Sequence, residues 1–273
     1  MKEFTLNNGV NIPAVGLGVF RLENPDEAYQ TVRTALETGY RHIDTAMIYG
    51  NEEAVGRAIK DSGIPREDIF ITTKLWNDDQ RSGMVHEAIE KSRKKLQVDY
   101  IDLYLVHWPV QRTYVTIWKK MEQILEEGLT RAIGVCNYQK HHLHNLFKEA
   151  AINPAVNQIE CYPYLAQQEL VGYCLEKGIR PEAWGPLGAG KSDILSNPVI
   201  TRLAEKYQKT PAQIVLGWNL QRGVIVIPKS SHRERQLENL QAVEFEMDEA
   251  DINQITLLNK NLRLGADPDH FNF

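Results

Sequence analysis

Four polar residues of different chemistry follow short apolar segments in the first half of the chain. Asp44 and Tyr49 lie in the stretch GYRHIDTAMIYGNE, Lys74 ends the segment IFITTK, and His107 ends IDLYLVH. If these segments are successive parallel strands, their C-terminal ends meet at one end of a barrel, where such folds place their chemistry. The four residues therefore form one candidate site.

This set of side chains suits the protonation of an oxygen that has just become negative. A hydride added to a carbonyl leaves an alkoxide, which must receive a proton before the step is complete. A free tyrosine, with a pKa of about 10, is a slow acid near neutral pH, and a neighbouring ammonium lowers that pKa. Lys74 would act on Tyr49 in this way, and Asp44 would hold Lys74 in place. A neutral His107 would orient the carbonyl oxygen.

The elements that position these residues are predicted from alternation of apolar and amphipathic segments. The first six apolar segments recur at roughly the length of one strand–helix unit, about 25–30 residues. Because the alternation continues without a break in composition, it predicts one closed (β/α)8 barrel, with residues 1–273 forming a single domain. The predicted strands cover residues 41–44, 69–74, 101–106, 131–136, 155–160, 179–184, 224–229 and, more weakly, 242–245.

Helices are predicted between the strands, and irregular structure at the end of the chain. Thr210-Pro211 opens one helix with a cap residue and a proline. Asn8-Gly9 predicts a hairpin turn before the first barrel strand. The tail from Leu262 has no helical periodicity and is expected to run over the surface. Apolar residues at helical spacing predict helices over residues 25–37, 51–60, 84–96 and 114–126.

Composition excludes several classes of partner. The 273 residues carry a formal charge of −5, so no net positive field attracts nucleic acid or an anionic membrane. The N-terminus has no apolar leader, and no segment approaches the ~20 apolar residues of a membrane span. Cys136, Cys161 and Cys174 have no CxxC spacing and are expected to be free thiols in a reducing compartment. A cytoplasmic protein is predicted.

A phosphate-loop nucleotide hydrolase is the natural rival, because residues 185–192, GPLGAGKS, match the pattern GxxxxGK[ST]. Such a loop must run directly into a helix whose N-terminus faces the phosphates. Here Asn197-Pro198 indicates a turn soon afterwards, and the later strand VIVIPK has no acid to hold Mg²⁺. This alternative is therefore weak.

Two further enzyme classes are also weakly supported. A glycosidase needs two carboxylates roughly 5–9.5 Å apart. Asp44 and Glu160 stand near strand ends, but the fourth and seventh strands end on Cys136-Asn137 and Pro228-Lys229. A Rossmann fingerprint is missing as well, because Gly16-Leu17-Gly18 lacks the third glycine and precedes no helix.

A metal site is not predicted. His141, His142 and His144 lie close together on a predicted helix, but no nearby carboxylate or cysteine completes a ligand set. A solvated helix face is the preferred interpretation of these histidines.

The chain as a whole resembles the aldo-keto reductases. The resemblance runs through the motifs NIPAVGLGVF, HIDTAMIYGNE, TTKLWN, YLVHWP, RAIGVCNY, AVNQIE, WGPLGAGK and IPKSSHRERQLENL, which are long and occur in order. It implies an NADPH-dependent carbonyl reductase, active as a monomer, on a (β/α)8 barrel. Tyr49 would be the general acid, Lys74 and Asp44 the pair that tunes its pKa, and His107 the residue that orients the substrate.

The resemblance also implies how the nicotinamide would be bound. Asn137 and Gln158 correspond to the pair that hydrogen-bonds the carboxamide, and Trp184 to the ring that stacks on the nicotinamide. Cys136 stands where the family usually has serine. Because a thiol is a weaker hydrogen-bonding group, two alternatives stay open: slightly looser anchoring of the nicotinamide, or sensitivity of Cys136 to oxidants.

The phosphate and adenine contacts of NADPH are implied in the same way. A loop would pass over the pyrophosphate, a basic cluster would bind the 2′-phosphate, and two residues would contact adenine. His232 stands where related bacterial enzymes carry a more basic residue, which bears on how strongly NADPH is preferred. The implied residues are Leu187, Gly188 and Ser192 for the pyrophosphate, Lys229, Ser230 and Arg235 for the 2′-phosphate, and Glu238 and Asn239 for adenine.

The substrate pocket is expected to be aromatic and open. Phe20, Trp76, Trp108 and Phe271 would form its walls, and the segment after His107 is short, which suits small carbonyl substrates. Within the family, the sequences of these motifs are most similar to those of bacterial 2,5-diketo-D-gluconate reductases and glyoxal reductases. Small aldehydes, α-dicarbonyls and keto sugar acids are the implied substrates. An NADPH-binding sensor with little turnover is the alternative from another class.

Overall fold

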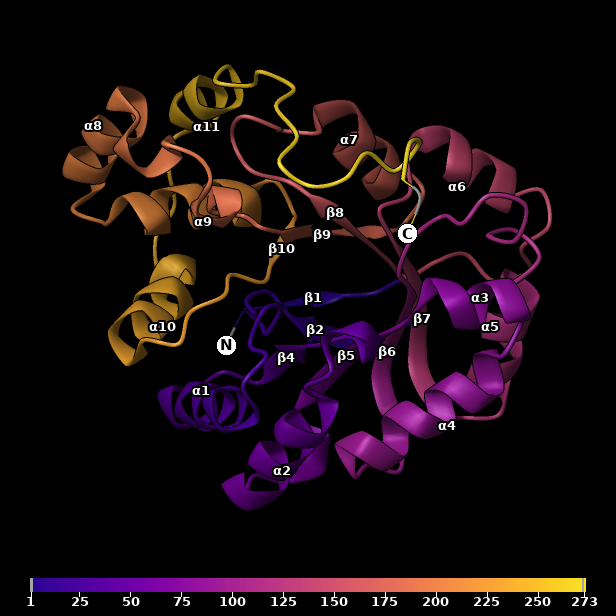
Figure 1. The fold of residues 1–273 in the computed structure, drawn as a ribbon. Helices are drawn as coiled ribbons and strands as arrows, with labels where there is room; N and C mark the ends of the chain where they lie inside the picture. The colour runs from indigo at the N-terminus through magenta and orange to yellow at the C-terminus, as the bar shows by residue number, and fades with distance from the viewer. Residues whose placement is uncertain (1, 272) are drawn as a thin grey trace.

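Eight parallel strands surrounded by helices make up the protein (Figure 1). The structure is a computed structural model and describes residues 2–271 and 273. The strands lie in the sheet in the order in which they occur in the chain, from β3 to β10. They are β3 (Leu17–Gly18), β4 (His42–Asp44), β5 (Phe70–Leu75), β6 (Ile101–Val106), β7 (Thr130–Cys136), β8 (Val156–Glu160), β9 (Arg180–Trp184) and β10 (Ile225–Val226).

The sheet closes on itself between its first and last strands. Val15 forms a parallel bridge with Val226. The Gly16 amide donates to the carbonyl of Val226 at 2.8 Å, and the Val226 amide donates to Ala14 at 3.0 Å. The predicted (β/α)8 barrel is therefore confirmed.

Two strand predictions were wrong. The first barrel strand is Leu17–Gly18, a segment that is missing from the predicted strands. It is too short to show an alternating pattern, and a side chain at Gly18 would come within 2.8 Å of the carbonyl oxygen of Ile227. Residues 242–245 are not a strand, because the 3-10 turn η5 (Gln241–Val243) occupies the first two of them and no strand follows it within the segment. Ala242 is buried there against the surrounding helices.

The helices begin and end largely where the capping residues indicate. Asn24 accepts hydrogen bonds from two amides of the first turn of α1, and Gly39 ends that helix at a φ of 108°. Thr210 and Gln213 form a capping box at the start of α9. The helix predicted over residues 114–126 is regular only from Trp118.

The helices are α1 (Pro25–Thr38), α2 (Glu52–Ser62), α3 (Asn77–Ser82), α4 (Val85–Leu96), α5 (Trp118–Glu126), α6 (Lys140–Leu146), α7 (Gln168–Glu176), α8 (Pro198–Tyr207), α9 (Pro211–Gln221), α10 (Arg233–Leu240) and α11 (Glu249–Thr256). None of these described helices is long and apolar enough to cross a membrane.

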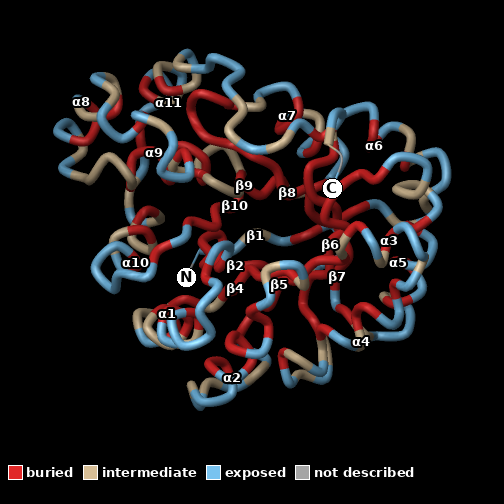
Figure 2. Tube along the Cα trace, viewed as in Figure 1, coloured by how far each residue is buried: buried red, intermediate tan, exposed pale blue. Residues whose placement is uncertain are grey.

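The core lies in the strands and on the inner faces of the helices, as Figure 2 shows in red. The predicted hairpin is present as β1 (Glu3–Thr5) and β2 (Asn11–Pro13), which pair antiparallel. Its apolar residues Leu6 and Ile12 pack against residues inside the barrel, among them Phe70 at the start of β5. The hairpin therefore closes the N-terminal end of the barrel, and chemistry is left to the C-terminal ends of the strands.

Candidate active site

The four residues predicted to act together do lie at one end of the barrel. Asp44 is the last residue of β4, and Tyr49 ends the short 3-10 helix η1 (Met47–Tyr49) that follows it. Lys74 lies near the end of β5, and His107 directly follows β6. Because β4, β5 and β6 are parallel neighbours in the sheet, these ends are adjacent.

Lys74 and Asp44 form a buried ion pair. The ammonium Nζ lies 2.7 Å from Asp44 Oδ1 and also donates to the carbonyl oxygen of Thr45 at 2.8 Å. Burial is the largest single effect and acts to lower the pKa of Lys74, but the Asp44 carboxylate, together with Tyr49 and Cys136, raises that pKa above the ordinary value. Burial raises the pKa of Asp44, against the opposing charge of Lys74. The site thus holds a fixed cation at neutral pH.

Tyr49 lies beside this cation, with Lys74 Nζ 5.2 Å from the centroid of its ring. The Lys74 charge acts to lower the pKa of the phenol, as predicted. Burial is the larger effect, however, and the pKa of Tyr49 is raised above its ordinary value. The predicted net lowering was wrong, because sequence reasoning omitted the desolvation of the phenolate. Tyr49 therefore stays protonated around neutral pH and can serve as a proton donor.

His107 is a neutral imidazole facing the same space. Its ring centroid lies 5.8 Å from that of Tyr49 and 5.2 Å from that of Trp76. Burial, followed by the charge of Lys74, holds the pKa of His107 well below its usual range. Its Nδ1 has no hydrogen-bond partner in the described part of the chain. The ring is thus neutral, as predicted, and a neutral ring is able to orient a carbonyl oxygen by hydrogen bonding.

Asn137 and Trp184 meet next to His107. Asn137 follows β7 with a φ of 65°, and its side-chain nitrogen donates to the carbonyl of His107 at 3.0 Å and to Cys136 Sγ at 3.2 Å. Its side-chain oxygen accepts from Trp184 Nε1 at 2.9 Å. The structure thus brings together the amide and the aromatic ring that the resemblance assigned to nicotinamide.

Gln158 completes this group, and Cys136 lies between the two amides. Gln158 Nε2 donates to Asp44 Oδ2 at 2.7 Å, and Cys136 Sγ lies 3.6 Å from Gln158 Oε1. Burial raises the pKa of the Cys136 thiol. Because the thiolate is the form that reacts with oxidants, the weaker-anchoring alternative is favoured over oxidant sensitivity.

The pocket wall is aromatic and includes a residue that sequence reasoning missed. Phe20 lies 5.0 Å from Tyr49 between ring centroids, and Phe271 lies 5.0 Å from Trp108. Phe273 had not been named, yet its ring is parallel to that of Trp76, with the centroids 5.9 Å apart. Phe273 could have been predicted as a wall residue from its position two residues after Phe271 in the same tail. Figure 1 shows this tail, in yellow, running back over the barrel.

The residues predicted to bind phosphates lie on two neighbouring segments. The 3-10 turn η3 (Gly188–Gly190) follows Leu187, and the next α-helix in the chain begins only at Pro198. Only the short 3-10 turn η4 (Ile194–Ser196) comes between, so no α-helix runs directly out of Ser192, which agrees with the argument against a phosphate loop. Ser192 Oγ accepts from the amide of Ile194 at 3.2 Å.

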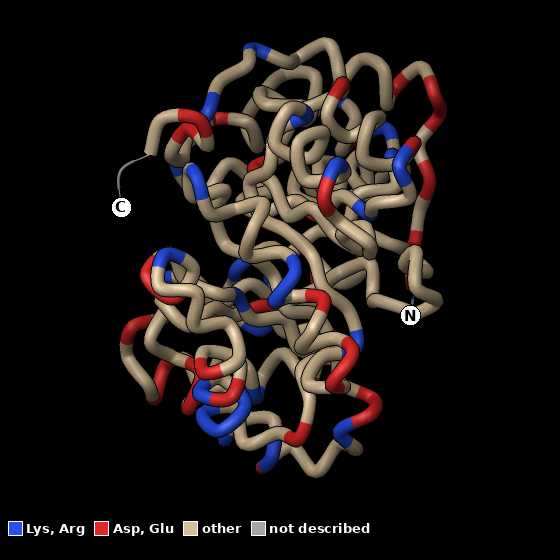
Figure 3. The backbone as a smooth tube through the Cα atoms, turned by 90° about the vertical axis from the view of Figure 1, so that its right-hand side faces the viewer, with Lys and Arg blue, Asp and Glu red and all other residues tan. Residues whose placement is uncertain are grey.

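The second segment follows β10 and continues into α10. Lys229 and Arg235 are exposed, and neither forms an ion pair with any described residue. Ser230 and Asn239 are buried, and Glu238 accepts a hydrogen bond from the Thr210 hydroxyl. Two unpaired cations beside a buried hydroxyl fit a phosphate group. Elsewhere the charges are mixed, as Figure 3 shows for one side of the molecule.

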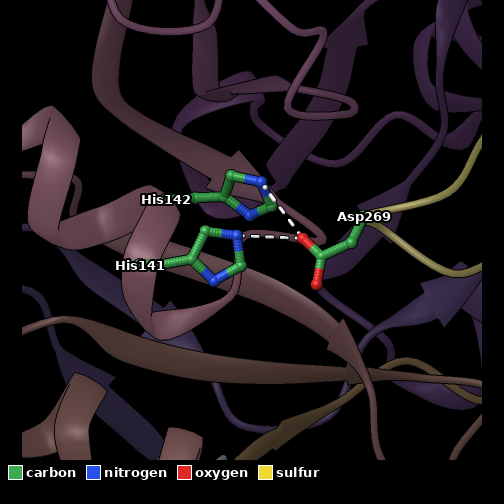
Figure 4. A group of neighbouring side chains, drawn as sticks. All are labelled: His141, His142 and Asp269. Carbon is green, nitrogen blue, oxygen red and sulfur yellow. Dashed lines mark ion pairs between the residues drawn. The ribbon is translucent and has the colours of Figure 1, made fainter.

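The predicted absence of a carboxylate near the helical histidines was wrong (Figure 4). Asp269 of the tail brings Oδ1 within 2.9 Å of His141 Nε2 and 3.4 Å of His142 Nε2, and the three side chains could surround a metal ion. However, the backbone amide of Gln139 donates to His142 Nδ1 at 3.1 Å. A neutral His142 then carries its proton on Nε2, which makes that atom a donor to Asp269 instead of a metal ligand. We therefore interpret this group, the His–Asp clamp, as an attachment point of the tail.

Glu160 is also used by the tail. Its carboxylate accepts from the amides of Leu264 at 2.7 Å and Gly265 at 3.0 Å, and Arg263 lies 3.7 Å away. Because these groups occupy the acid, it does not provide the second carboxylate that a glycosidase needs.

Comparisons with known proteins agree with this geometry. Residues 14–260 match the model of the aldo/keto reductase family. The chain is 49% identical to the glyoxal reductase of Bacillus subtilis, over 98% of this chain and 96% of the relative. It is 47% identical to the methylglyoxal reductase DkgA of Escherichia coli K12, over 97% and 96%.

A solved structure is similar throughout. The aldo-keto reductase MGS-M4 from a Medee basin deep-sea metagenome library superposes with a TM-score of 0.95 at 44% identity, covering 99% of this chain and 100% of that one. Family model, relatives and structure agree over nearly the whole length. The chain therefore belongs to the aldo/keto reductase family and is an oxidoreductase.

Proposed function

We propose that this protein uses NADPH to reduce small aldehydes and α-dicarbonyls to alcohols, with Tyr49 as the general acid. The observation that carries the proposal is the buried Lys74–Asp44 ion pair beside Tyr49, with the neutral His107 facing the same space. This arrangement suits the protonation of an alkoxide. Acid–base work of this kind contributes about 10²–10⁴ in rate.

Each residue has a separate task in the proposed reaction. When bound, the reduced nicotinamide supplies the hydride. His107 hydrogen-bonds the carbonyl oxygen, and Tyr49 gives its proton to that oxygen as negative charge develops there. Lys74 stabilises the phenolate that remains, while Asp44 holds the ammonium in place. An alkoxide is a much stronger base than a phenolate, so the raised pKa of Tyr49 does not prevent the transfer.

The donors present fit an NADPH molecule. Asn137, Gln158 and Trp184 offer two amides and an indole ring next to the proton donor. At the other end, Lys229 and Arg235 are exposed and lack partners within the described chain. A planar guanidinium and an ammonium suit the dianionic 2′-phosphate that distinguishes NADPH from NADH.

Small α-dicarbonyls are the proposed substrates. Phe271 and Phe273 pack on Trp108 and Trp76, so the walls offer apolar contacts and few anchors for the hydroxyls of a sugar acid. Two relatives are named for glyoxal and methylglyoxal reduction. A keto sugar acid such as 2,5-diketo-D-gluconate is expected to be a poorer substrate.

The proposed function is tested by replacing Tyr49 with phenylalanine. We expect Tyr49→Phe to lose at least ~10² in kcat because the proton donor is gone. Turnover is followed by NADPH absorbance with methylglyoxal, 2,5-diketo-D-gluconate, an aromatic aldehyde and a simple ketone. NADPH should still quench tryptophan fluorescence in the variant. Near-normal turnover would contradict the role of Tyr49, and NADPH binding by the wild type without any turnover would favour the sensor alternative.

The cofactor assignment is tested at Arg235. We expect Arg235→Ala to raise the Kd for NADPH about tenfold or more, because charge-assisted contacts to a phosphate are strong. The Kd for NADH should change little, since NADH has no 2′-phosphate. Titration of both cofactors measures the two changes. An equal rise in the Kd for NADPH and for NADH would mean that Arg235 does not contact the 2′-phosphate.

A further inference from the structure

Glu182 is a fully buried acid in the barrel interior to which the proposed reaction assigns no role. It lies in β9 and pairs in register with Gln158 of β8. Because paired residues of neighbouring parallel strands point to the same face, both side chains enter the barrel. Glu182 Oε1 accepts from Gln158 Nε2 at 2.5 Å.

The same nitrogen of Gln158 also donates to Asp44 Oδ2 at 2.7 Å. A side-chain amide nitrogen has two hydrogens, so both hydrogens are held by acids from β4 and β9. An amide turned by 180° would instead bring its oxygen against the Asp44 carboxylate and against Oε1 of Glu182, the oxygen that accepts from Nε2 in the observed orientation. The observed orientation leaves Oε1 with only the weak donor Cys136 Sγ, 3.6 Å away. Oε1 is therefore available to accept a hydrogen bond from an incoming N–H group.

The next inward position of β9 has a parallel task. Trp184, two residues after Glu182, donates from Nε1 to Asn137 Oδ1 at 2.9 Å. Residues two apart on a strand face the same side. One strand thus orients the two amides that the proposed function places at the nicotinamide carboxamide.

We propose that Glu182 is a positioning residue for the cofactor: by holding the Gln158 amide, it directs Oε1 toward the NH₂ group of the nicotinamide carboxamide. The inference rests on the proposed function, because it requires that Gln158 contacts this group. Glu182 acts through Gln158 and does not itself touch the cofactor.

The charge state of Glu182 fits this role. Burial, and then the charge of Asp44, raise its pKa to about 8. The acid is therefore mostly neutral at pH 7 and can accept through its carbonyl oxygen without adding a second negative charge beside Asp44. Glutamine has nearly the same shape and keeps that carbonyl, so it should replace glutamate at this position.

The experiment compares ligands that differ at the carboxamide. Calorimetry gives the Kd of three probes: NADP⁺, its 3-acetylpyridine analogue, in which a methyl group replaces the NH₂, and adenosine 2′,5′-bisphosphate, which lacks the nicotinamide. Removal of one orienting hydrogen bond should raise a Kd about five- to tenfold. We expect Glu182→Leu to raise the Kd for NADP⁺ by this factor. The Kd for the analogue should change less than about twofold, and the Kd for the bisphosphate should stay the same. Glu182→Gln should stay within about twofold of wild type for all three probes.

Two further variants keep the test decisive. If Glu182→Leu does not fold, Glu182→Val removes the acceptor with a strand-compatible residue. In a Gln158→Leu background, the change at residue 182 should no longer alter the ratio of the NADP⁺ and analogue Kd values. Equal losses for NADP⁺ and the analogue would overturn the positioning role. A wild-type protein that bound the bisphosphate as tightly as NADP⁺ would instead contradict the proposed nicotinamide site.

Discussion

At the scale of single residues, the order of the site depends on how many hydrogen bonds hold each polar side chain in place. Lys74 and Asp44 use their hydrogen bonds on each other and on neighbouring groups. Cys136 is the weak point, because its thiol stands between Asn137 and Gln158 at sulfur distances of 3.2 and 3.6 Å. A hydroxyl at this position would make shorter and stronger hydrogen bonds to both amides.

We therefore expect Cys136→Ser to tighten NADPH binding about two- to fivefold, since a better hydrogen-bonding partner would hold the two amides more firmly. Fluorescence titration with NADPH measures the change. Cys174→Ser is the matched control, because this buried cysteine of α7 contacts Asn157 and not the site. Weaker binding in Cys136→Ser would show that the thiol contributes by shape instead.

At the scale of elements, the C-terminal tail completes the pocket. It is attached to the barrel at Glu160, then at the His–Asp clamp, and finally where the backbone oxygen of Phe273 accepts from Asn77 at 2.9 Å and Arg81 at 2.7 Å. Between the last two attachments it carries Phe271, which packs on Trp108. The clamp should therefore control how firmly the aromatic wall is held.

We expect Asp269→Ala to raise the KM for methylglyoxal by about three- to tenfold, because the hydrogen bonds of the clamp are lost. The NADPH Kd should remain close to wild type, since the clamp contacts none of the proposed cofactor residues. Steady-state kinetics at saturating NADPH give the change. Asp61→Ala is the control, because Asp61 is exposed on α2 and its side chain accepts a hydrogen bond from Tyr29, far from the clamp. An unchanged KM would mean that the tail is held without the clamp.

At the scale of the whole molecule, burial of neutral histidines makes the fold sensitive to acid. Burial lowers the pKa of His42 to about 3 and that of His142 to about 4. In the unfolded chain these rings take up protons below about pH 6.5. Stability from each is therefore fully present above that pH and is lost as the pH falls toward the folded pKa. Glu182 acts in the opposite sense, because its raised pKa adds stability on acidification below about pH 8.

A comparison of wild type with His42→Gln isolates one histidine from these opposing effects. Between pH 7 and pH 4.5, the free energy of unfolding of the wild type should fall by about 2–3 kcal/mol more than that of the variant, at about 1.4 kcal/mol per pH unit below pH 6.5. Urea denaturation at several pH values measures both curves. Parallel pH profiles would show that His42 does not take up a proton on unfolding.

The sequence by itself determined the architecture and the chemical types at the site. Alternating segments of β and helical period indicated the barrel, since each period reflects which face of an element is buried. Asp44, Tyr49, Lys74 and His107 were identifiable because each lies at the C-terminal end of a predicted strand or a few residues after it. These features depend on residues that are close together in the sequence, so they can be recognised without the tertiary structure.

Only the tertiary structure decided which distant groups meet and what burial does to them. Asp269 reaches His141, Phe273 reaches Trp76, and Glu182 holds Gln158, and none of these pairings leaves a periodic signal in the chain. The raised pKa of Tyr49 was likewise invisible, because desolvation depends on everything packed around the phenol. Contacts between distant segments arise from chain closure in three dimensions, and only the folded barrel specifies them.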